Sequence, residues 1–276
     1  MKKINRRSFL AAAGLTAAAL ALTACGGSAS STASSTASSA ASSEAASTSA
    51  AAELTTVEAG KLTMATNAAF PPYEMTTDAG EFEGIDIDTA KAIAEKLGLE
   101  LQIDDMDFDA ALLSVQQGKA DIVMAGVTVT DERKAVMDFS DSYATGIQSI
   151  IVPEGSDITS PDDLAGKKTQ RGTTGYIYCS DDFGDDAVVA YDDGLTAVQA
   201  LKNGQVDAVV IDNAPAQEFV AANPGLVILD TSYAEEDYAI GLAKGSALED
   251  AVNAALEELK ADGTLQSIVD KYITAE

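Results

Sequence analysis

Two periods of hydrophobic positions alternate along the chain. Residues 62–66 form a short apolar run that is typical of a buried strand. Within residues 90–97 the apolar positions recur at helical spacing, and residues 99–103 alternate between apolar and polar, which indicates a strand. A second helix is expected over residues 109–117 and a third strand over residues 121–125. This β-α-β-α-β order predicts an α/β fold with a largely parallel sheet.

The same alternation restarts in the second half of the chain. Residues 148–152 and 206–211 are apolar runs that predict strands, and residues 195–201 carry a helical pattern between them. Ser246, with Glu249 three residues later, makes a capping box and predicts the start of a long helix. The two halves therefore indicate two α/β lobes.

The N-terminal segment has the pattern of an export signal. Basic residues within the first seven positions precede an Ala- and Leu-rich run over residues 9–24, which is short for a membrane span. The run ends in Leu22-Thr23-Ala24-Cys25, which resembles the lipobox of bacterial lipoproteins. We expect a signal peptide over residues 1–24 and a lipid anchor on Cys25. The alternative is an ordinary signal peptide that contains a cysteine, and Arg6-Arg7 leaves both the general and the twin-arginine export routes open.

A tether is expected between the signal and the folded part. Residues 25–58 are dominated by Ser, Ala and Thr, with almost nothing large enough to form a core, so we expect this stretch to be disordered.

The chain contains two cysteines, Cys25 and Cys179. If Cys25 is acylated, no intramolecular disulfide can form, and we expect Cys179 to be a small buried residue.

Charge and composition exclude several classes of function. The 276 residues include 44 acidic and 17 basic ones, and the net charge of −27 would repel the phosphates of nucleic acids. Histidine is absent, which removes the commonest general base and the commonest metal ligand. We expect no cofactor and no metal, and any enzyme chemistry would have to use carboxylates, Lys, Tyr or Ser.

Two charged residues are candidates for holding a zwitterion. Residues 126–133 follow an expected strand and open a helix, so backbone N–H groups and the Arg133 guanidinium would converge on one anion, best a carboxylate. Asp212 directly follows an apolar strand and could receive an ammonium group. The alternatives are a surface ion pair for Arg133 and a helix cap for Asp212. Residues 172–175 form a second turn of small residues that could add N–H and hydroxyl donors.

Seven short motifs follow one another along the folded part of the chain. They are Ala65-Thr66-Asn67-Ala68-Ala69-Phe70-Pro71-Pro72-Tyr73, Gly84-Ile85-Asp86-Ile87-Asp88, Met106-Asp107-Phe108-Asp109, residues 126–133, Asp138-Phe139-Ser140-Asp141, residues 172–175 and Ile211-Asp212-Asn213. In this order they resemble the family 3 extracellular solute-binding proteins of amino-acid importers. The likeness runs from about Lys61 to the C-terminus.

The resemblance implies a two-lobed periplasmic-binding-protein fold of type II, the Venus-flytrap arrangement. Lobe I would comprise residues 59–142 and 239–276, and lobe II residues 148–233. Two crossover strands, residues 143–147 and 234–238, would form the hinge. The implied protein is a monomeric, extracytoplasmic binding component of an ABC importer, lipid-anchored to the outer face of the cytoplasmic membrane, with a permease and an ATPase as partners.

The resemblance also implies which residues hold a free polar amino acid. Arg133 and the Thr128 amide would hold the carboxylate, with Thr174 helping from the other lobe. Asp212, the Ala125 carbonyl and the Thr128 hydroxyl would hold the ammonium group. The four residues that would enclose the side chain are Asn67, Phe70, Phe108 and Gln170. Glutamine is the expected ligand, with histidine or arginine competing, because Asn67 and Gln170 offer donors and acceptors and carry no fixed charge.

Two departures from the family's pattern bear on the ligand. Members that favour cationic side chains often place a carboxylate at the position of Asn67, so the neutral amide weakens a lysine or arginine assignment. Residues 168–171 are polar and about two residues shorter than the apolar strand usual there. A guanidinium from Arg171 turned into the pocket would favour glutamate.

Two other functions stay open at this point. One is a periplasmic dehydratase of the cyclohexadienyl or arogenate type, an enzyme with the same fold. The absence of histidine and of an obvious buried acid pair argues against it. The other is a sensor ectodomain, although nothing after Tyr272 could span a bilayer.

Overall fold

The computed structural model describes residues 54–164 and 174–273, all within one compact unit, Ala50–Glu276. The predicted signal peptide, Cys25, most of the tether, Gln170 and Arg171 lie outside the described residues. Among the helices of this part of the chain, none combines the length and apolar character that crossing a membrane requires.

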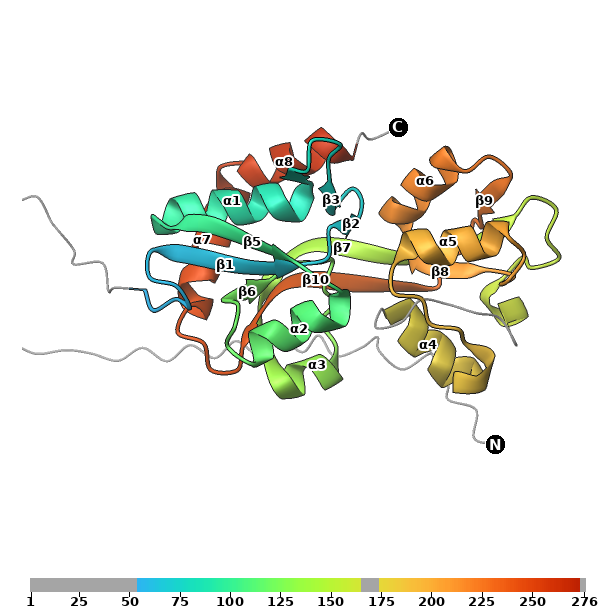
Figure 1. Cartoon of the computed structure of the whole chain (residues 1–276), viewed down its shortest axis with the longest axis horizontal. Coiled ribbons are helices and arrows are strands. Elements are labelled where there is room, and N and C mark those ends of the chain that lie inside the picture. The colour runs from blue at the N-terminus through green and yellow to red at the C-terminus, as the bar shows by residue number, and fades with distance from the viewer. Residues whose placement is uncertain (1–53, 165–173, 274–276) are drawn as a thin grey trace, which may run out of the picture. The chain divides into compact units, whose positions relative to one another are not determined.

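The described elements form two groups, which we call lobe I and lobe II (Figure 1). Lobe I contains the strands β1 (Lys61–Thr66), β2 (Ala69–Phe70), β3 (Glu74–Thr76), β4 (Phe82–Glu83), β5 (Glu100–Asp105) and β6 (Ile122–Val123). Its helices are α1 (Ile85–Leu97), α2 (Phe108–Gln116), α3 (Asp131–Val136), α7 (Glu249–Ala261) and α8 (Thr264–Tyr272). Lobe II contains the strands β8 (Val209–Asp212) and β9 (Leu226–Ile228) and the helices α4 (Thr174–Phe183), α5 (Gly194–Lys202) and α6 (Asn213–Ala222), with 3₁₀ turns at Pro161–Leu164 and Asp185–Ala187.

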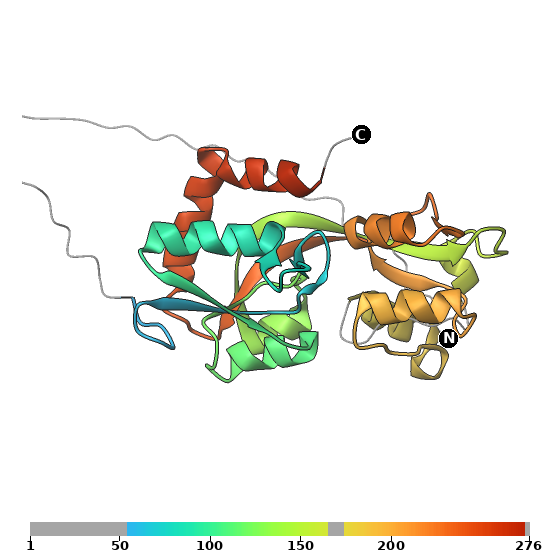
Figure 2. The same ribbon diagram turned by 45° about the horizontal axis from the view of Figure 1, so that its top comes forward.

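Two long strands run from one lobe into the other, as both ribbon views show (Figures 1 and 2). They are β7 (Met137–Pro153) and β10 (Ala234–Ala243), and they pair antiparallel along most of β10. The main sheet has the order β5-β1-β6-β10-β7-β8, with β9 also paired to β7. β7 runs from lobe I into lobe II, and β10 runs back beside it. Because the two strands pair, the strands of both lobes belong to one sheet.

The sheet is parallel in only one part. β1 pairs parallel with β5 and with β6, as the β-α-β pattern predicts. The pairings of β10 with β6, and of β7 with β10, β8 and β9, are antiparallel. The prediction of a largely parallel sheet is therefore wrong outside β5, β1 and β6, because β7 and β10 cross between the lobes in opposite directions and pair with each other.

Alternation along β1 distributes its side chains to two cores in lobe I. Leu62 and Met64 pack under α1 and α7, whereas Ala65 faces the other side, with Ala111 and Val115 of α2. Both faces of the strand are therefore buried, which explains its continuous apolar run.

Lobe II repeats this arrangement around β8. Ile211 packs with α5 and α6, while Val210 faces the opposite cluster with Cys179 of α4. Cys179 is buried, as expected for a small apolar thiol. The helix α4 that carries it was not predicted, because its sequence mixes polar and apolar residues without a clear stripe.

The start of α7 differs from the capping box that the sequence predicts. The helix begins at Glu249, and the Ser246 hydroxyl accepts a hydrogen bond from the Leu248 amide at 3.2 Å. Ser246 therefore closes the turn before the helix, because Ala247 and Leu248 still belong to that turn and α7 starts two residues later than a cap on Ser246 would place it.

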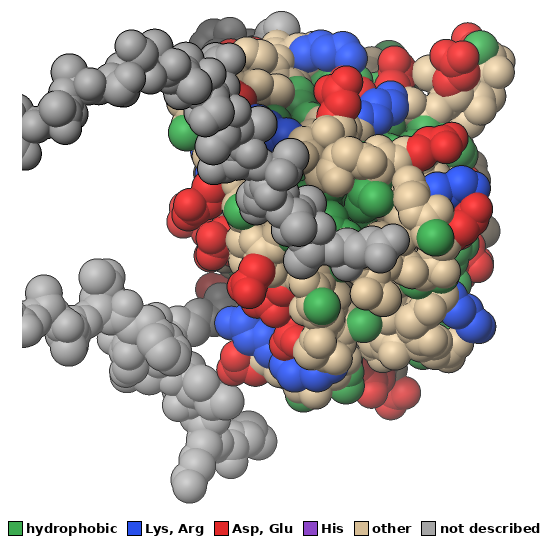
Figure 3. All heavy atoms as spheres, turned by 90° about the vertical axis from the view of Figure 1, so that its left-hand side faces the viewer, with side chains coloured by type: hydrophobic (Ala, Val, Ile, Leu, Met, Phe, Trp, Pro, Cys, Tyr) green, Lys and Arg blue, Asp and Glu red, His purple; other side chains and the backbone are tan. Residues whose placement is uncertain are grey.

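The surface carries charge of both signs. On the face drawn in Figure 3, acidic and basic side chains are scattered among polar ones without gathering into one patch. Lys96 contacts Glu258 at 3.2 Å and Asp262 at 3.3 Å, and both carboxylate side chains are well exposed. Such pairs add about 0–1 kcal/mol each, so the cores rather than the surface charges stabilise this fold.

Candidate functional site

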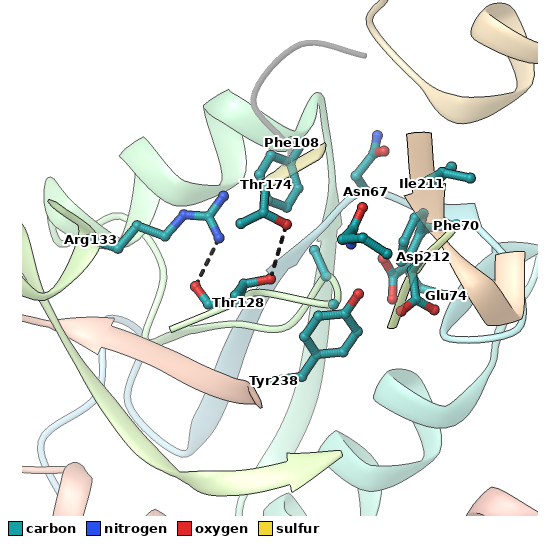
Figure 4. A pocket seen from close by; sticks show the side chains of 13 residues that line it. Asn67, Phe70, Glu74, Phe108, Thr128, Arg133, Thr174, Ile211, Asp212 and Tyr238 are labelled. Carbon is teal, nitrogen blue, oxygen red and sulfur yellow. Dashed lines mark hydrogen bonds between the residues drawn. The ribbon is translucent and has the colours of Figure 1, made fainter. Parts of the chain in front are cut away.

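A pocket lies where the two lobes meet the crossing strands (Figure 4). Its lining residues come from lobe I, from lobe II and from β7 and β10. They are Asn67, Phe70, Glu74, Phe108, Ala125, Gly126, Thr128, Arg133, Gln148, Thr174, Ile211, Asp212 and Tyr238.

The turn between β6 and α3 can approach the pocket closely because it begins with a glycine. Gly126 has φ +55°, and a Cβ there would lie 2.8 Å from a ring carbon of Phe70. The Gly126 amide donates to Asp86 Oδ2 at 3.0 Å, which fixes the turn against α1. At its other end the Thr130 hydroxyl caps α3 by accepting from the Arg133 amide at 3.2 Å. The loop that carries Thr128 and Arg133 is thus held at both ends.

Arg133 provides the positive side of the pocket. Its side chain is buried, and Nη1 donates to the Thr128 carbonyl at 2.8 Å. The guanidinium lies over the Phe108 ring, 5.3 Å from its centroid, in a cation–π contact. Burial lowers the pKa of Arg133 while the nearby Glu236 carboxylate acts in the opposite direction. Because guanidinium pKa values are so high, Arg133 stays charged and can bind an anion.

Asp212 lies at the other side of the pocket in Figure 4. It ends β8 and caps α6, since Oδ1 accepts from the Ala214 amide at 3.1 Å and Oδ2 from the Ile147 amide at 2.8 Å. Burial raises its pKa to about 6, against the two amides, which lower it. Asp212 therefore caps α6 and also lines the pocket, although the sequence analysis treated the cap and the ligand site as alternatives.

Aromatic rings form part of the pocket wall. Phe70 stacks on Tyr73 with centroids 5.8 Å apart, and Tyr73 meets the Tyr238 ring edge to face at 5.4 Å. Beside them, Asn67 Nδ2 donates to the Met106 carbonyl at 3.0 Å. The Asn67 side chain is therefore oriented with its amide NH₂ toward the backbone.

A buried carboxylate stands behind the wall. Glu236 Oε2 accepts from the Thr128 hydroxyl at 2.9 Å, the Thr174 hydroxyl at 2.8 Å and Gln148 Nε2 at 3.0 Å. These donors come from lobe I, lobe II and β7 in turn. One oxygen atom thus ties three lining residues together.

A second group of acids lies beneath the pocket, and it corrects the expectation that no buried acid pair exists. Glu74 and Asp86 are both fully buried, and the Glu74 oxygens meet no hydrogen-bond donor. Burial and the charge of Asp86 raise the pKa of Glu74 well above its usual value, and burial raises that of Asp86 to about 6. Two neighbouring carboxylates cannot both stay charged without water, so the pair holds a proton near neutral pH.

The structure brings together eight of the nine predicted ligand-binding residues, and the ninth, Gln170, lies outside the described residues. Their role in binding stays a prediction. The pocket also contains residues that the sequence analysis did not name for binding: Glu74, Gly126, Gln148, Ile211 and Tyr238. Gly126 and Ile211 fall inside quoted motifs, and Glu74 directly follows one. A single polar residue at the head of an apolar strand was the available signal for Gln148.

A family model matches residues 62–275, and its description is bacterial extracellular solute-binding proteins, family 3. The chain belongs to this family and has its two-lobed, type II fold. One relative is the probable histidine-binding protein of Neisseria gonorrhoeae, 32% identical over 285 residues that cover 99% of this chain and 98% of the relative.

Solved structures agree with this assignment. The arginine-, lysine-, histidine-binding protein ArtJ of Geobacillus stearothermophilus superposes with a TM-score of 0.75 at 34% identity, covering 78% of this chain and 96% of that one. An ancestral arginine-binding protein bound to glutamine gives a TM-score of 0.74 at 43% identity, covering 78% and 99%. An ancestral arginine-binding protein bound to arginine gives 0.73 at 43% identity, covering 78% and 98%.

The acid pair predicts how stability depends on pH. Because the folded-state pKa values of Glu74 and Asp86 lie above their unfolded values, the stability they contribute is complete below about pH 4 and is lost as the pH rises through about 6 and above. Glu74→Gln removes one of the two acids. The free energy of unfolding should therefore fall less between about pH 5 and pH 8 in this variant than in the parent. The expected difference is roughly 1–3 kcal/mol, measured by urea denaturation.

Glu81→Gln is the matched control, since Glu81 is exposed on the surface of the same lobe. It should leave the pH profile of the parent unchanged. A Glu74→Gln protein whose profile still runs parallel to that of the parent would contradict the shared-proton interpretation.

Proposed function

We propose that this protein is the amino-acid-binding component of an ABC importer. The observation that carries the proposal is the placement of Arg133 and Asp212 on opposite sides of one buried pocket. A free amino acid is a zwitterion, so it needs one cation for its carboxylate and one anion for its ammonium group. Arg133 with the Thr128 amide would hold the first, and Asp212 with the Ala125 carbonyl and the Thr128 hydroxyl the second.

The relatives support an amino acid as the solute. The Neisseria relative is named for histidine and ArtJ for arginine, lysine and histidine. One ancestral arginine-binding protein structure contains arginine and another contains glutamine. These ligands share the zwitterionic backbone and a long side chain that donates hydrogen bonds. We infer that this chain takes the same class, with Phe70 and Phe108 as flat walls for the side chain and Gln170 as a contact at its tip.

The charges of the pocket favour ligands with a neutral or positive side chain. Among the described lining residues Arg133 is the cation, whereas Asp212 and Glu74 are acids. An additional carboxylate on the ligand would have to be buried beside these acids, at a cost of several kcal/mol unless a cation paired with it. We therefore expect glutamine, histidine and arginine to bind in preference to glutamate.

Ligand capture would close the lobes. The carboxylate and ammonium contacts come from both lobes, so they form together only when the lobes meet, and binding would shift the population toward that form. The stretches 143–147 of β7 and 234–238 of β10 would act as the hinge, with residues 148–233 as the moving lobe. We infer no catalysis, since such relatives are binding proteins and the contacts described hold a ligand at its charged ends.

The clamp is tested by removing each charge. Arg133→Ala and Asp212→Ala should each weaken binding of the preferred amino acid by about 2–5 kcal/mol, because the opposite ligand charge is left buried without a partner. Arg133→Lys should not restore binding, since an ammonium lacks the planar fork. Isothermal titration calorimetry measures all three. Lys134→Ala, on the exposed side of α3, is the control and should bind like the parent. Near-parental affinity in either clamp variant would disprove the site.

Asn67 is the position through which specificity is tested. Asn67→Asp places a carboxylate at the pocket wall and should raise the ratio of arginine to glutamine affinity, by roughly tenfold for about 1.4 kcal/mol of pairing. Competition binding with both ligands measures the ratio. Absolute affinities are expected to fall somewhat, because the aspartate can no longer donate to the Met106 carbonyl. An unchanged ratio would show that Asn67 does not reach the ligand's side chain.

The lipid anchor is a separate proposal. We infer that Cys25 carries the acyl chains and that residues 25–58 tether the binding domain outside the membrane, beside a permease and its ATPase. Cys25→Ser should release the protein from the membrane fraction of the producing cells, measured by fractionation and immunoblot. Ser28→Ala, in the tether, should leave the protein on the membrane. A serine variant that stays with the membrane would contradict the anchor.

A further inference from the structure

We propose that Glu236 is a positioning residue that makes one wall of the pocket a set of hydrogen-bond acceptors for the ligand's ammonium group. Glu236 does not line the pocket, but the three side chains it holds do. The inference rests on the proposed amino-acid site and adds a residue that determines which end of the ligand faces this wall.

The hydrogens of the two threonines decide the direction of their bonds. A hydroxyl has one hydrogen, and a carboxylate oxygen can only accept. The contacts from Thr128 and Thr174 to Glu236 Oε2, at 2.9 and 2.8 Å, are ordinary O–H···O bonds, whereas the two hydroxyls are 3.5 Å apart, beyond that range. Both hydroxyl hydrogens are thus used by Glu236. What each threonine offers to the pocket is a lone pair.

Gln148 is oriented in the same way. Its NH₂ end faces Glu236 at 3.0 Å, and a carboxylate would reject the carbonyl end there. Its Oε1 is buried and has no hydrogen-bond donor, and the side chain as a whole is 3% exposed. A buried acceptor without a donor is unfavourable by about 1–3 kcal/mol, so Glu236 holds Gln148 in this orientation against that cost.

The acceptors match an ammonium group and not a carboxylate. An ammonium carries three hydrogens and no acceptor, so it can bond to Asp212, the Ala125 carbonyl and the Thr128 hydroxyl at once. A ligand carboxylate at the same wall would face lone pairs and the charge of Glu236. The carboxylate must then be bound by N–H donors alone, from the Arg133 guanidinium and from the Thr128 and Thr174 amides.

The groups around Glu236 are consistent with this role. It is 5% exposed and lies on β10 between Glu235 and Asp237, which point to solvent. Its neighbours in the interior include Arg133, whose charge balances it, and Tyr178 of α4, whose pKa is raised by burial and by Glu236. The alternation of β10 therefore selects one of three consecutive acids for the interior.

The test compares three ligands that differ at one end only. They are L-arginine, its analogue without the amino group, 5-guanidinopentanoic acid, and its analogue without the carboxylate, L-argininamide. Glu236→Gln and Glu236→Ala should weaken L-arginine and L-argininamide about tenfold or more but weaken 5-guanidinopentanoic acid less than threefold, by calorimetry. Glu236→Ala should weaken L-arginine less in a Thr128→Val background than in the parent, because part of the effect of Glu236 acts through the Thr128 hydroxyl.

Glu235→Gln is the control, an exposed acid one residue away on the same strand, and should bind all three ligands like the parent. Equal losses for L-arginine and 5-guanidinopentanoic acid, or no loss at all, would overturn the role of Glu236 while leaving the amino-acid site intact. If Glu236→Ala does not fold, the affinity ratio in Glu236→Gln decides. A parent protein that binds none of the common amino acids would overturn the proposed function and this inference with it.

Discussion

The antiparallel pairing of β7 with β10 is the constraint on which the rest of the structure depends. The two strands pair from Ala234 with Gln148 to Ala243 with Met137, so they belong to both lobes at once. They bring Gln148, Glu236 and Tyr238 to the base of the pocket, where neither lobe alone could place them. The register shifts around Tyr238 and Ala239 show that the ladder changes its alignment at this level. The same pair of strands therefore supplies the polar residues at the base of the pocket and the irregularity in the ladder beside them.

Tyr238 sets the packing at that level, and small residues make room for it. Its ring is buried, and a Cβ on Gly146 of the paired strand would lie 2.5 Å from the ring. A Cβ on Gly126 would approach both Tyr238 and Phe70. Two glycines far apart in the sequence therefore surround one aromatic side chain. Because the same contacts hold Phe70 in the pocket wall, the packing of the crossover also determines the shape of the site.

The sequence predicts those features that depend on local pattern and on short motifs. Periodicity places β1, β5 and β6 and the helices α1 and α2 of lobe I, and residues from the motif Gly126 to Arg133 line the pocket. The direction of the crossing strands could not be predicted this way, since it depends on which strands pair. Glu236 was missed for a related reason. Three acids in succession at 235–237 suggest a solvated stretch, and only the pairing with β7 shows which of them is interior.

The balance of buried charge follows from these positions. Arg133 faces the pocket with Glu236 behind it, while Asp212 and the Glu74–Asp86 pair lie across from it. Each buried carboxylate is partly compensated: Asp212 by two backbone amides, Glu236 by two hydroxyls and an amide, and the acid pair by a retained proton. Arg133 balances the charge of Glu236, whereas the partners of Asp212 and of the acid pair carry no full positive charge, so an acidic surplus is left facing the space. A ligand ammonium group relieves that surplus, and a guanidinium or amide at the far end of the ligand would relieve it further. A second carboxylate on the ligand would increase this surplus of negative charge. The charge of the pocket therefore disfavours acidic ligands, whatever contacts their side chains make.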